Sequence, residues 1–418
     1  MDHNEEIDVP SYFLCPISLE IMKDPVTVCT GITYDRESIE KWVFSSNNTC
    51  CPVTKQVLVN NEISNTDILL TPNHTLRRLI QSWCTLNACY GVERFPTPKA
   101  PVTKAQIQKL IGEGPSSSPY RLMKCLETIK SIGTQSGANK RCLETTPGVA
   151  QFLARVIVIG EDENDERRVS EEALSILAHL NMSDEMVLKK MLNENNEGNK
   201  LVDALVKIMQ RSNYNSRAYA VGLLKQLIQV GDPIHVVALK REHFVEIVTL
   251  IKDDVTPKAT RAALRVLALA CPWGRNRIRV VESGAIPVLV GLLVEWNDKR
   301  TTEIMLTVLD HLSGCAEGRA AILGHAAGLA VVSKKILRVS NFATEKGVKI
   351  LFSISRFSGS PSVVQEMMQL GVVTKLYMVL QVDCETKTKE KVREIFKLHA
   401  RAWRKSPCAP AHIFDSFC

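Results

Sequence analysis

The chain has 418 residues, 45% of them hydrophobic and 23% charged, with a formal net charge of +7 at pH 7. These proportions are ordinary for a globular protein and supply enough apolar material for a sizeable core. A charge this small for the length does not require nucleic acid, and we expect no nucleic-acid partner. The longest apolar run, residues 285–294, contains Pro287 and Gly291. It is far shorter than the roughly 20 residues that cross a membrane, so we expect no integral membrane segment.

The thirteen cysteines are an odd number and lack the regular spacing of a disulfide framework. The chain begins MDHNEE, which is acidic and contains no apolar signal region. Reduced thiols in the cytoplasm or the nucleus are therefore the natural interpretation. We expect a cytoplasmic protein, with the nucleus as a second compartment.

The most informative stretch is FLCPISLEIMKDP at residues 13–25, followed by GITYDR at 31–36 and CPVTKQ at 51–56. At metal-ligand spacing Cys15 is followed by Ser18 instead of a cysteine, and Cys51 by Thr54. The thiols and imidazoles before His74 are Cys15, Cys29, Cys50, Cys51 and His3. Two tetrahedral zinc sites cannot be built from this set, so we expect no metal. Hydrogen bonds and ion pairs must close the loops instead, among Ser18, Asp24, Asp35, Arg36, Glu40, Thr54 and Lys55.

Residues 8–90 are predicted to form one compact domain. Short strands at 26–28 and 32–34 flank a turn, and a helix follows over 35–43 with Asp35 as its cap. A second helix is predicted over 75–86. The residues expected on the buried faces of these two helices are Ile39, Trp42, Val43, Leu76, Leu79, Ile80 and Trp83.

Residues 91–120 are predicted to be a linker because proline and serine are concentrated there. A short helix over 104–111 interrupts it. Thr97 and Ser118 each precede a proline, a weak signal for proline-directed phosphorylation.

The rest of the chain repeats with a period near 42 residues. Apolar segments recur around Leu177, Leu224, Leu267, Leu309 and Leu351, and a second marker recurs at Gly284, Gly328 and Gly371. Periods of about 40 to 47 residues with two or three helices each are typical of HEAT and armadillo arrays. We therefore predict six or seven armadillo repeats over residues 121–405, stacked into a superhelix, and a tail over 406–418.

Residues 10–84 resemble the U-box, and nearly the whole chain is similar to plant U-box ubiquitin ligases with C-terminal armadillo repeats. Within that family it is most similar to the stress- and defence-responsive subgroup. The fold class implied is mainly α: an armadillo-repeat superhelix, or α-solenoid, with a small N-terminal α+β U-box that holds no metal. The function implied is that of an E3 ubiquitin-protein ligase, a RING-type ubiquitin transferase without a cofactor.

In such a ligase the U-box recruits a ubiquitin-conjugating enzyme charged with ubiquitin, and the repeats hold a protein substrate. Ubiquitin passes to lysines of the substrate and of the ligase itself by proximity and orientation, with no covalent intermediate on the ligase and no catalytic acid or base. The resemblance also allows a homodimer formed through the U-box.

By the same resemblance, Ile17 and Pro52 form an apolar shelf for the conjugating enzyme, and Trp42 lines the groove between them. Lys55 lies where related ligases carry a cation that touches both the conjugating enzyme and ubiquitin. Alternative interpretations are core packing for Trp42 and a solvated or internally paired charge for Lys55. Structural support of the first loop is expected from Cys15, Asp24 and Pro25.

The segment CPWGRNR at 271–277 combines an aromatic side chain, Trp273, with two cations, Arg275 and Arg277. Such side chains are enriched at interface hot spots, so this segment is a candidate contact for substrate. The alternative is a loop between helices with its tryptophan packed into the stack.

Three other functions are alternatives to that of a ligase, and each would need a feature that distinguishes it. A non-catalytic armadillo scaffold would not need the apolar pair Ile17 and Pro52. A receptor for basic peptides would need regular Trp and Asn ladders, which the repeats lack. A ligase that carries ubiquitin as a thioester would need Cys15 as nucleophile, but its neighbours are apolar and a buried thiol behaves as a small hydrophobic group.

Overall fold

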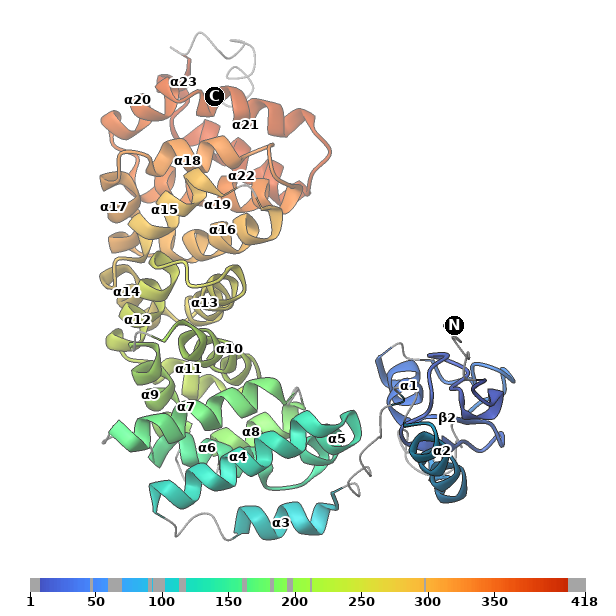
Figure 1. Cartoon of the computed structure of the whole chain (residues 1–418). Coiled ribbons are helices and arrows are strands. Elements are labelled where there is room, and N and C mark those ends of the chain that lie inside the picture. Colours follow the sequence, from blue (N-terminus) through green and yellow to red (C-terminus); the bar gives the residue numbers. More distant parts are fainter. Residues whose placement is uncertain are drawn as a thin grey trace, which may run out of the picture. The chain divides into compact units, whose positions relative to one another are not determined.

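The computed structural model describes residues 8–45, 48–58, 70–88, 92, 102–112, 118–159, 164–180, 184–193, 198–210, 213–296 and 298–404. The chain divides into two compact units (Figure 1). The first comprises residues 1–114 and 127–149, and the second comprises residues 115–126 and 150–418. Helix α4 (Pro119–Gln135) passes from one unit to the other. Thr97 and the predicted tail at 406–418 lie outside the described residues.

The first unit contains a three-stranded antiparallel sheet in the order β2-β1-β3. Its strands are β1 (Pro25–Thr27), β2 (Thr33–Asp35) and β3 (Thr71–Pro72), and Val26 of β1 lies opposite Tyr34 and Pro72. The turn between β1 and β2 places Gly31 at a φ of 81°, which a residue without a Cβ adopts readily. The two predicted strands are therefore confirmed, each shifted by one residue.

The first unit also contains helices. They are η1 (Ser11–Phe13), α1 (Arg36–Glu40), a π-helical turn η2 (Lys41–Ser45), α2 (His74–Leu86), α3 (Lys104–Gly112) and α5 (Gly137–Thr145). Of these, α1 contacts β2 and α2 contacts β1. The predicted helix over 35–43 is thus α1 continued by η2. Within α2 the buried side chains are Ile80 and Cys84, whereas Leu79 is 52% exposed. The prediction that Leu79 faces the core was wrong, because the buried positions of α2 are spaced by four residues.

The N-terminal part of the first unit has its own core of buried side chains from both loops, the sheet and two helices. They are Phe13, Cys15, Met22, Val26, Val28, Tyr34, Ile39, Val43, Cys51, Leu58, Ile80 and Cys84. Phe13 meets Trp83 of α2 edge to face, with ring centroids 5.9 Å apart. Because the core draws on segments far apart in sequence, it ties the N-terminal loops to α2.

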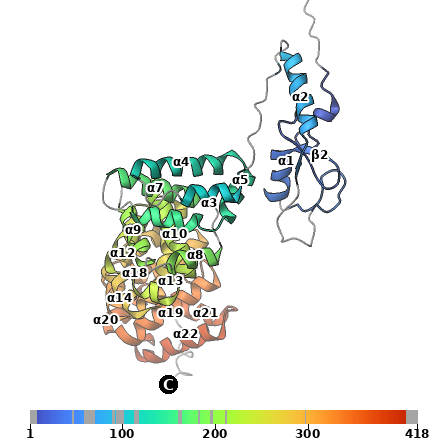
Figure 2. The same ribbon diagram turned by 90° about the horizontal axis from the view of Figure 1, so that it is seen from below.

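The second unit is a stack of short helices. Its helices are α6 (Val149–Ile159), α7 (Asn164–His179), α8 (Glu185–Asn193), α9 (Gly198–Met209), α10 (Tyr214–Val230), α11 (Pro233–Val237), α12 (Arg241–Lys252), α13 (Pro257–Ala270), α14 (Gly274–Glu282), α15 (Ala285–Glu295), α16 (Lys299–Ser313), α17 (Ala316–Gly324), α18 (Gly328–Lys335), α19 (Asn341–Ser358), α20 (Pro361–Gln369), α21 (Val372–Gln381), α22 (Thr386–Leu398) and α23 (Ala400–Trp403). From α8 to α22 they form triplets, and the third helix of each triplet packs on the third helix of the next (Figure 1, Figure 2).

We call α7, α10, α13, α16, α19 and α22 the third-helix ladder. The first five of these helices each carry one of the apolar residues that set the sequence period, and α22 continues the stack. All five marker residues are buried: Leu177, Leu224, Leu267, Leu309 and Leu351. The period read from the sequence is therefore the spacing of the buried faces of this ladder.

Side chains bind backbone carbonyls of the preceding triplet. Asn276 Nδ2 donates to the carbonyl of Val236 over 2.7 Å. Lys335 Nζ donates to the carbonyl of Trp296 over 3.0 Å, at the end of α15. The last carbonyls of a helix have no partner within the helix, so these side chains satisfy groups that would otherwise be unpaired.

The glycine marker of the sequence has two structural meanings. Gly284 and Gly371 are left-handed N-cap residues of α15 and α21, with φ of 77° and 67°. Gly328 is instead the first helical residue of α18, and Ala327 holds the N-cap position. A Cβ at Gly328 would lie 2.0 Å from the carbonyl oxygen of Ile322. The marker thus precedes or begins a helix in all three repeats, but only two of the glycines are left-handed caps.

Across the described ranges, no single helix is both long and apolar enough to cross a membrane, although one bent helix pair passes by length and composition. In the same part of the chain, no three Cys, His, Asp or Glu side chains gather as a metal site would require.

Candidate functional site

The first loop, residues 15–20, is closed by its own backbone. The N–H of Cys15 donates to the carbonyl of Glu20 over 2.8 Å, and the N–H of Leu19 donates to the carbonyl of Cys15 over 2.8 Å. Leu19 has a φ of 60°, in the left-handed region that few residues other than glycine adopt. The fully buried sulfur of Cys15 accepts the N–H of Asp35 at 3.3 Å. The loop is thus fixed at its start, and Ile17 packs half-buried against the core.

The second loop, residues 51–56, repeats this geometry. The N–H of Cys51 donates to the carbonyl of Gln56 over 2.8 Å, and the N–H of Lys55 donates to the carbonyl of Cys51 over 2.9 Å. Lys55 has a φ of 59°. The two loops therefore match residue by residue, and this match pairs Ile17 with Val53 and places Lys55 where the first loop has its left-handed residue.

Hydroxyl groups gather around the sulfur of Cys51. The Tyr34 hydroxyl lies 3.0 Å from the sulfur and the Thr30 hydroxyl lies 3.4 Å from it. Burial raises the pKa of Cys51, but hydrogen bonds from Thr30, Thr54 and Tyr34 outweigh it and lower the pKa to about 6. The second loop is therefore organised around a buried sulfur stabilised as a thiolate.

Two carboxylates join the loops to the helices. Asp35 Oδ1 accepts the N–H groups of Lys23 and Asp24 over 2.8 and 2.9 Å. Asp24 pairs with Arg36 at 2.6 Å and with Arg77 at 3.5 Å, and its side chain is only 18% exposed. Asp35 is the N-cap residue of α1 but makes no side-chain capping bond. The sequence placed it correctly, but its carboxylate is used to hold the segment before β1.

Pro25 and Trp42 fix two further points. The carbonyl of Pro25, in β1, accepts the N–H of Asn73 over 2.8 Å. The indole N–H of Trp42 donates to the carbonyl of Cys50 over 2.9 Å, and the half-buried ring packs against the core. Trp42 therefore connects η2 to the start of the second loop.

The two loops also expose apolar side chains that the sequence analysis missed. Pro52 is half-buried like Ile17, whereas Leu19 is 74% exposed and Val53 is 53% exposed. Val57, directly after the second loop, is 62% exposed. The signal for them was present in the parallel hexapeptides CPISLE and CPVTKQ, which place Val53 at the position of Ile17. Lys55 is exposed and makes no ion pair with any residue that the structure describes.

The predicted substrate residues of the second unit differ in their surroundings. Trp273, at the N-cap of α14, is 39% exposed, and Arg275 is exposed. Arg277 is half-buried and donates to the carbonyls of Cys271 and Pro272 over 3.3 and 3.2 Å. Trp273 and Arg275 are therefore accessible, whereas the guanidinium of Arg277 is engaged by the backbone.

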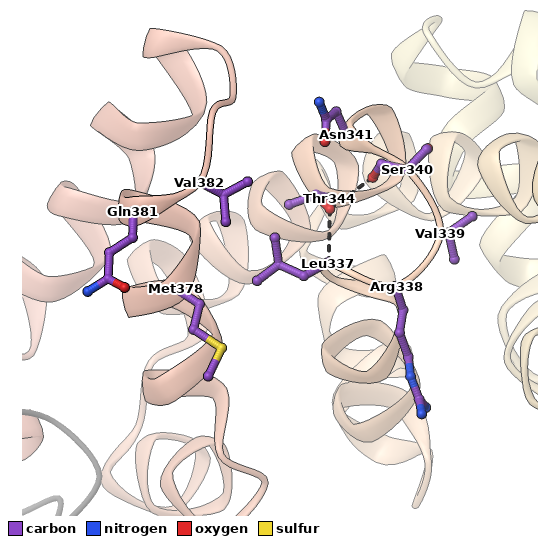
Figure 3. Close-up of a pocket in the computed structure, with 9 residues that line it drawn as sticks. All are labelled: Leu337, Arg338, Val339, Ser340, Asn341, Thr344, Met378, Gln381 and Val382. Atoms are coloured by element: carbon purple, nitrogen blue, oxygen red, sulfur yellow. Dashed lines mark hydrogen bonds between the residues drawn. The ribbon is translucent and has the colours of Figure 1, made fainter.

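A pocket of about 470 Å³ lies in the second unit, between the connection from α18 to α19 and the end of α21 (Figure 3). It is lined by Leu337, Arg338, Val339, Ser340, Asn341, Thr344, Met378, Gln381 and Val382. Leu337 has a φ of 59°, and its N–H donates to the Thr344 hydroxyl over 3.0 Å. Pockets of this size accept small ligands or side chains. Because its lining contains no carboxylate, imidazole or thiol, and the Thr344 hydroxyl is engaged by the N–H of Leu337, this pocket is suited to binding.

Comparisons with known proteins cover both units. Residues 9–88 match the U-box domain family, and residues 106–417 match the family described as the plant U-box protein ARM repeat region. From Arabidopsis thaliana, the E3 ubiquitin-protein ligases PUB22 and PUB23 are each 51% identical to the chain, over 99% of it and over 99% and 98% of their own lengths. The E3 ubiquitin-protein ligase PUB24 is 38% identical over 97% of the chain and 95% of its own length.

A solved structure from work on the interaction between cadherin and beta-catenin also resembles the chain. Its TM-score is 0.54 at 14% identity, covering 82% of this chain and 61% of that one. At this identity the likeness concerns the fold alone.

Asp24→Asn is expected to lower the free energy of unfolding of the first unit by about 1–3 kcal/mol, because the two arginines would lose a charged acceptor in a poorly solvated place. Urea unfolding read by limited proteolysis and mass spectrometry measures this in the full chain. Glu37→Gln is the matched control, since the Glu37–Lys41 pair is solvent-exposed and should contribute far less. Equal losses in the two variants would contradict the role assigned to Asp24.

Stability of the first unit should also depend on pH through Cys51. Its pKa is about 6 in the folded protein, against 9.0 for an ordinary thiol. The stability that the thiolate adds is therefore fully present above the higher value and is lost as the pH falls toward the lower one. The same unfolding assay should show this decline, and Cys51→Ser should flatten it. Cys29→Ser, at an exposed cysteine, should retain it; an unchanged slope in Cys51→Ser would refute the assignment.

Proposed function

The chain belongs to the family of plant U-box proteins with an armadillo-repeat region, and we propose that it transfers ubiquitin from a charged conjugating enzyme to proteins bound by its repeats. The resemblance stated from the sequence is confirmed, as is the fold class of a helical repeat array with a small U-box. The chain is accordingly an E3 ubiquitin-protein ligase.

The matched geometry of the two loops is the observation that carries this proposal. Each loop is held rigid by the same pair of backbone hydrogen bonds, and each presents apolar side chains to solvent. A folded protein rarely keeps such residues together on loops unless a partner covers them. We assign the docking of the conjugating enzyme to Ile17 and Pro52, as the resemblance predicts, and add Val53 to them.

The chemistry requires orientation by the ligase rather than an acid or a base on it. The neutral amine of a substrate lysine attacks the thioester carbonyl of the charged enzyme; the isopeptide C–N bond forms, the C–S bond breaks, the enzyme's cysteine leaves as thiolate, and the proton lost by the amine passes to water. The ligase accelerates this step by holding the thioester near the amine in a reactive geometry. Trp42 contributes by fixing the second loop through its hydrogen bond to Cys50.

Lys55 is placed to touch both the conjugating enzyme and ubiquitin. Its left-handed backbone is set by the loop, and its charge is free of ion pairs within the described residues. Its ammonium group is a point charge without the planar fork of arginine, so it would stabilise the closed arrangement by charge alone.

A covalent ubiquitin intermediate on Cys15 or Cys51 finds no support. The sulfurs of Cys15 and Cys51 belong to fully buried residues and are engaged by hydrogen bonds. A nucleophile must reach the thioester of a separate protein, which a buried sulfur cannot do without unfolding its loop.

The substrate is assigned to the second unit. Trp273 and Arg275 remain the substrate contacts proposed from the sequence. Arg277 instead stabilises the same segment through its hydrogen bonds to backbone carbonyls. The pocket between the α18–α19 connection and the end of α21 offers a further contact point, with both polar and apolar side chains, on the same unit. A role in plant defence or stress signalling, the cytoplasmic and nuclear location, and a homodimer formed through the U-box stay predictions.

Incubation of the full chain with activating enzyme, a panel of conjugating enzymes, ubiquitin, ATP and a chelator is expected to give a ladder of ubiquitinated products. Ile17→Ala and Val53→Asp should reduce the rate at least about tenfold, which corresponds to roughly 1.4 kcal/mol of docking energy. Leu79→Asp, at an exposed apolar position of α2, is the control and should retain the ladder. A folded protein that yields no ladder with any conjugating enzyme would favour the scaffold function instead.

Lys55 can be tested separately from docking. In single-turnover discharge of a charged conjugating enzyme to free lysine, Lys55→Glu should slow discharge about tenfold because the sign of the charge is reversed, and Lys55→Arg should preserve or raise the rate. Arg78→Glu, at an exposed cation of α2, is the control for net charge. Equal rates for all three variants would show that Lys55 is only a solvated surface residue.

A further inference from the structure

Two neighbouring helices of the third-helix ladder contain no acidic residue. Helix α10 has the sequence YNSRAYAVGLLKQLIQV and α13 has PKATRAALRVLALA, so every charge on them is positive. The two helices pack directly on each other in the second unit. Their basic residues are Arg217, Lys225, Lys258, Arg261 and Arg265.

Three of these cations form a cluster without a counter-ion. Arg217 is set apart, because it is buried and pairs with Asp253 at 2.6 Å. Lys225, Lys258 and Arg265 have no hydrogen bond or ion pair with any part of the chain that the structure describes. Burial and the nearby charges of Arg265 and Lys258 lower the pKa of Lys225. Lys225 is half-buried and is repelled by Lys258 and Arg265, which are both exposed. These three side chains are here called the cation cluster.

The cluster continues into an exposed apolar end. On α13, Lys258, Arg265 and Leu269 are separated by seven and four residues, which places them on one face of the helix. Leu269 is 38% exposed, and the next exposed aromatic residue along the chain is Trp273 at 39%. One face of α13 thus changes from cationic at its start to apolar at its end.

The neighbouring helices of the ladder carry charges of both signs. Helix α7, which packs on α10, has Glu171 and Glu172 beside Arg167 and Arg168, and α16, which packs on α13, has acidic Glu303 and Asp310 but begins with two basic residues. The stretch without acidic residues is therefore limited to α10 and α13, which favours a short anionic segment that covers two helices.

Unpaired cations repel one another in the free protein. Together with exposed apolar side chains, they are complementary to a ligand that carries both carboxylates and an apolar group. We propose that the cation cluster and the apolar end of α13 bind an extended, acidic peptide segment of the substrate, with its Asp and Glu side chains over Lys225, Lys258 and Arg265 and an apolar side chain beside Leu269. The assignment rests on the proposed function, since it names the class of substrate that the repeats hold. It also extends the sequence-based contact at Trp273 along the whole face of α13.

Fluorescence polarisation with the full chain tests this directly. The probe is a short fluorescein-labelled peptide rich in Asp and Glu with one Leu-Phe pair, compared with the same peptide carrying Lys at every acidic position. The double variant Lys258→Glu/Arg265→Glu should weaken binding of the acidic peptide at least about tenfold, because two attractions become repulsions. Lys190→Glu/Lys200→Glu, at exposed lysines of α8 and α9, makes the same change in net charge and should weaken it less than about twofold through long-range charge alone.

Thermal unfolding by circular dichroism confirms that both double variants remain folded before affinities are compared. Binding of the acidic peptide that rises at low salt and is lost only in the cluster variant supports the proposal. Equal binding in the two variants, or equal binding of the lysine peptide, overturns it. Tighter binding of phosphatidylserine vesicles or single-stranded RNA than of the acidic peptide, lost in the same variant, also overturns it in favour of another partner.

Autoubiquitination separates this proposal from the proposed function. If the unchanged chain makes no ladder, the ligase function fails while the peptide measurement still decides whether the cluster binds acidic segments.

Discussion

The ion pairs of Asp24 hold the U-box together at the point where its parts would otherwise separate. This carboxylate meets Arg36 at the start of α1 and Arg77 in α2, while its own N–H is held by Asp35. A domain this small buries limited apolar surface, and small domains often need a further cross-link such as a metal or a disulfide. Here the cross-link is a set of buried and half-buried polar contacts, and the geometry of both loops depends on it.

The armadillo unit meets the same need in a different way. Each triplet cannot cover its own apolar face, so its third helix is buried against the next. Between triplets, side chains such as Asn276 and Lys335 reach back to carbonyls at the ends of earlier helices. A surface made in this way is rigid and periodic, and local changes in side-chain charge can give each repeat a different binding character. The unpaired cations of α10 and α13 are such a change.

The sequence predicted the repeat well because burial of one leucine per unit requires a fixed spacing. It predicted less where several geometries satisfy the same pattern. Asp35 was placed correctly at a helix start, but its carboxylate binds the preceding segment, since two N–H groups there need an acceptor. Gly328 recurs with Gly284 and Gly371 in the sequence, but the spacing alone does not tell that its small size is used here while the other two are left-handed caps. Val53 was overlooked because its exposure follows from the matched loop geometry and not from a local pattern.

An array stabilised by nearest neighbours opens from its ends, because terminal helices have a packed neighbour on one side only. Helices α10 and α13 lie within the ladder, with α7 on one side and α16 on the other. Fraying at α22 and α23 can therefore proceed while α10 and α13 remain ordered, and amide hydrogen exchange should be slowest in these interior helices. A ligand held there would be kept in one orientation while the ends of the array fluctuate.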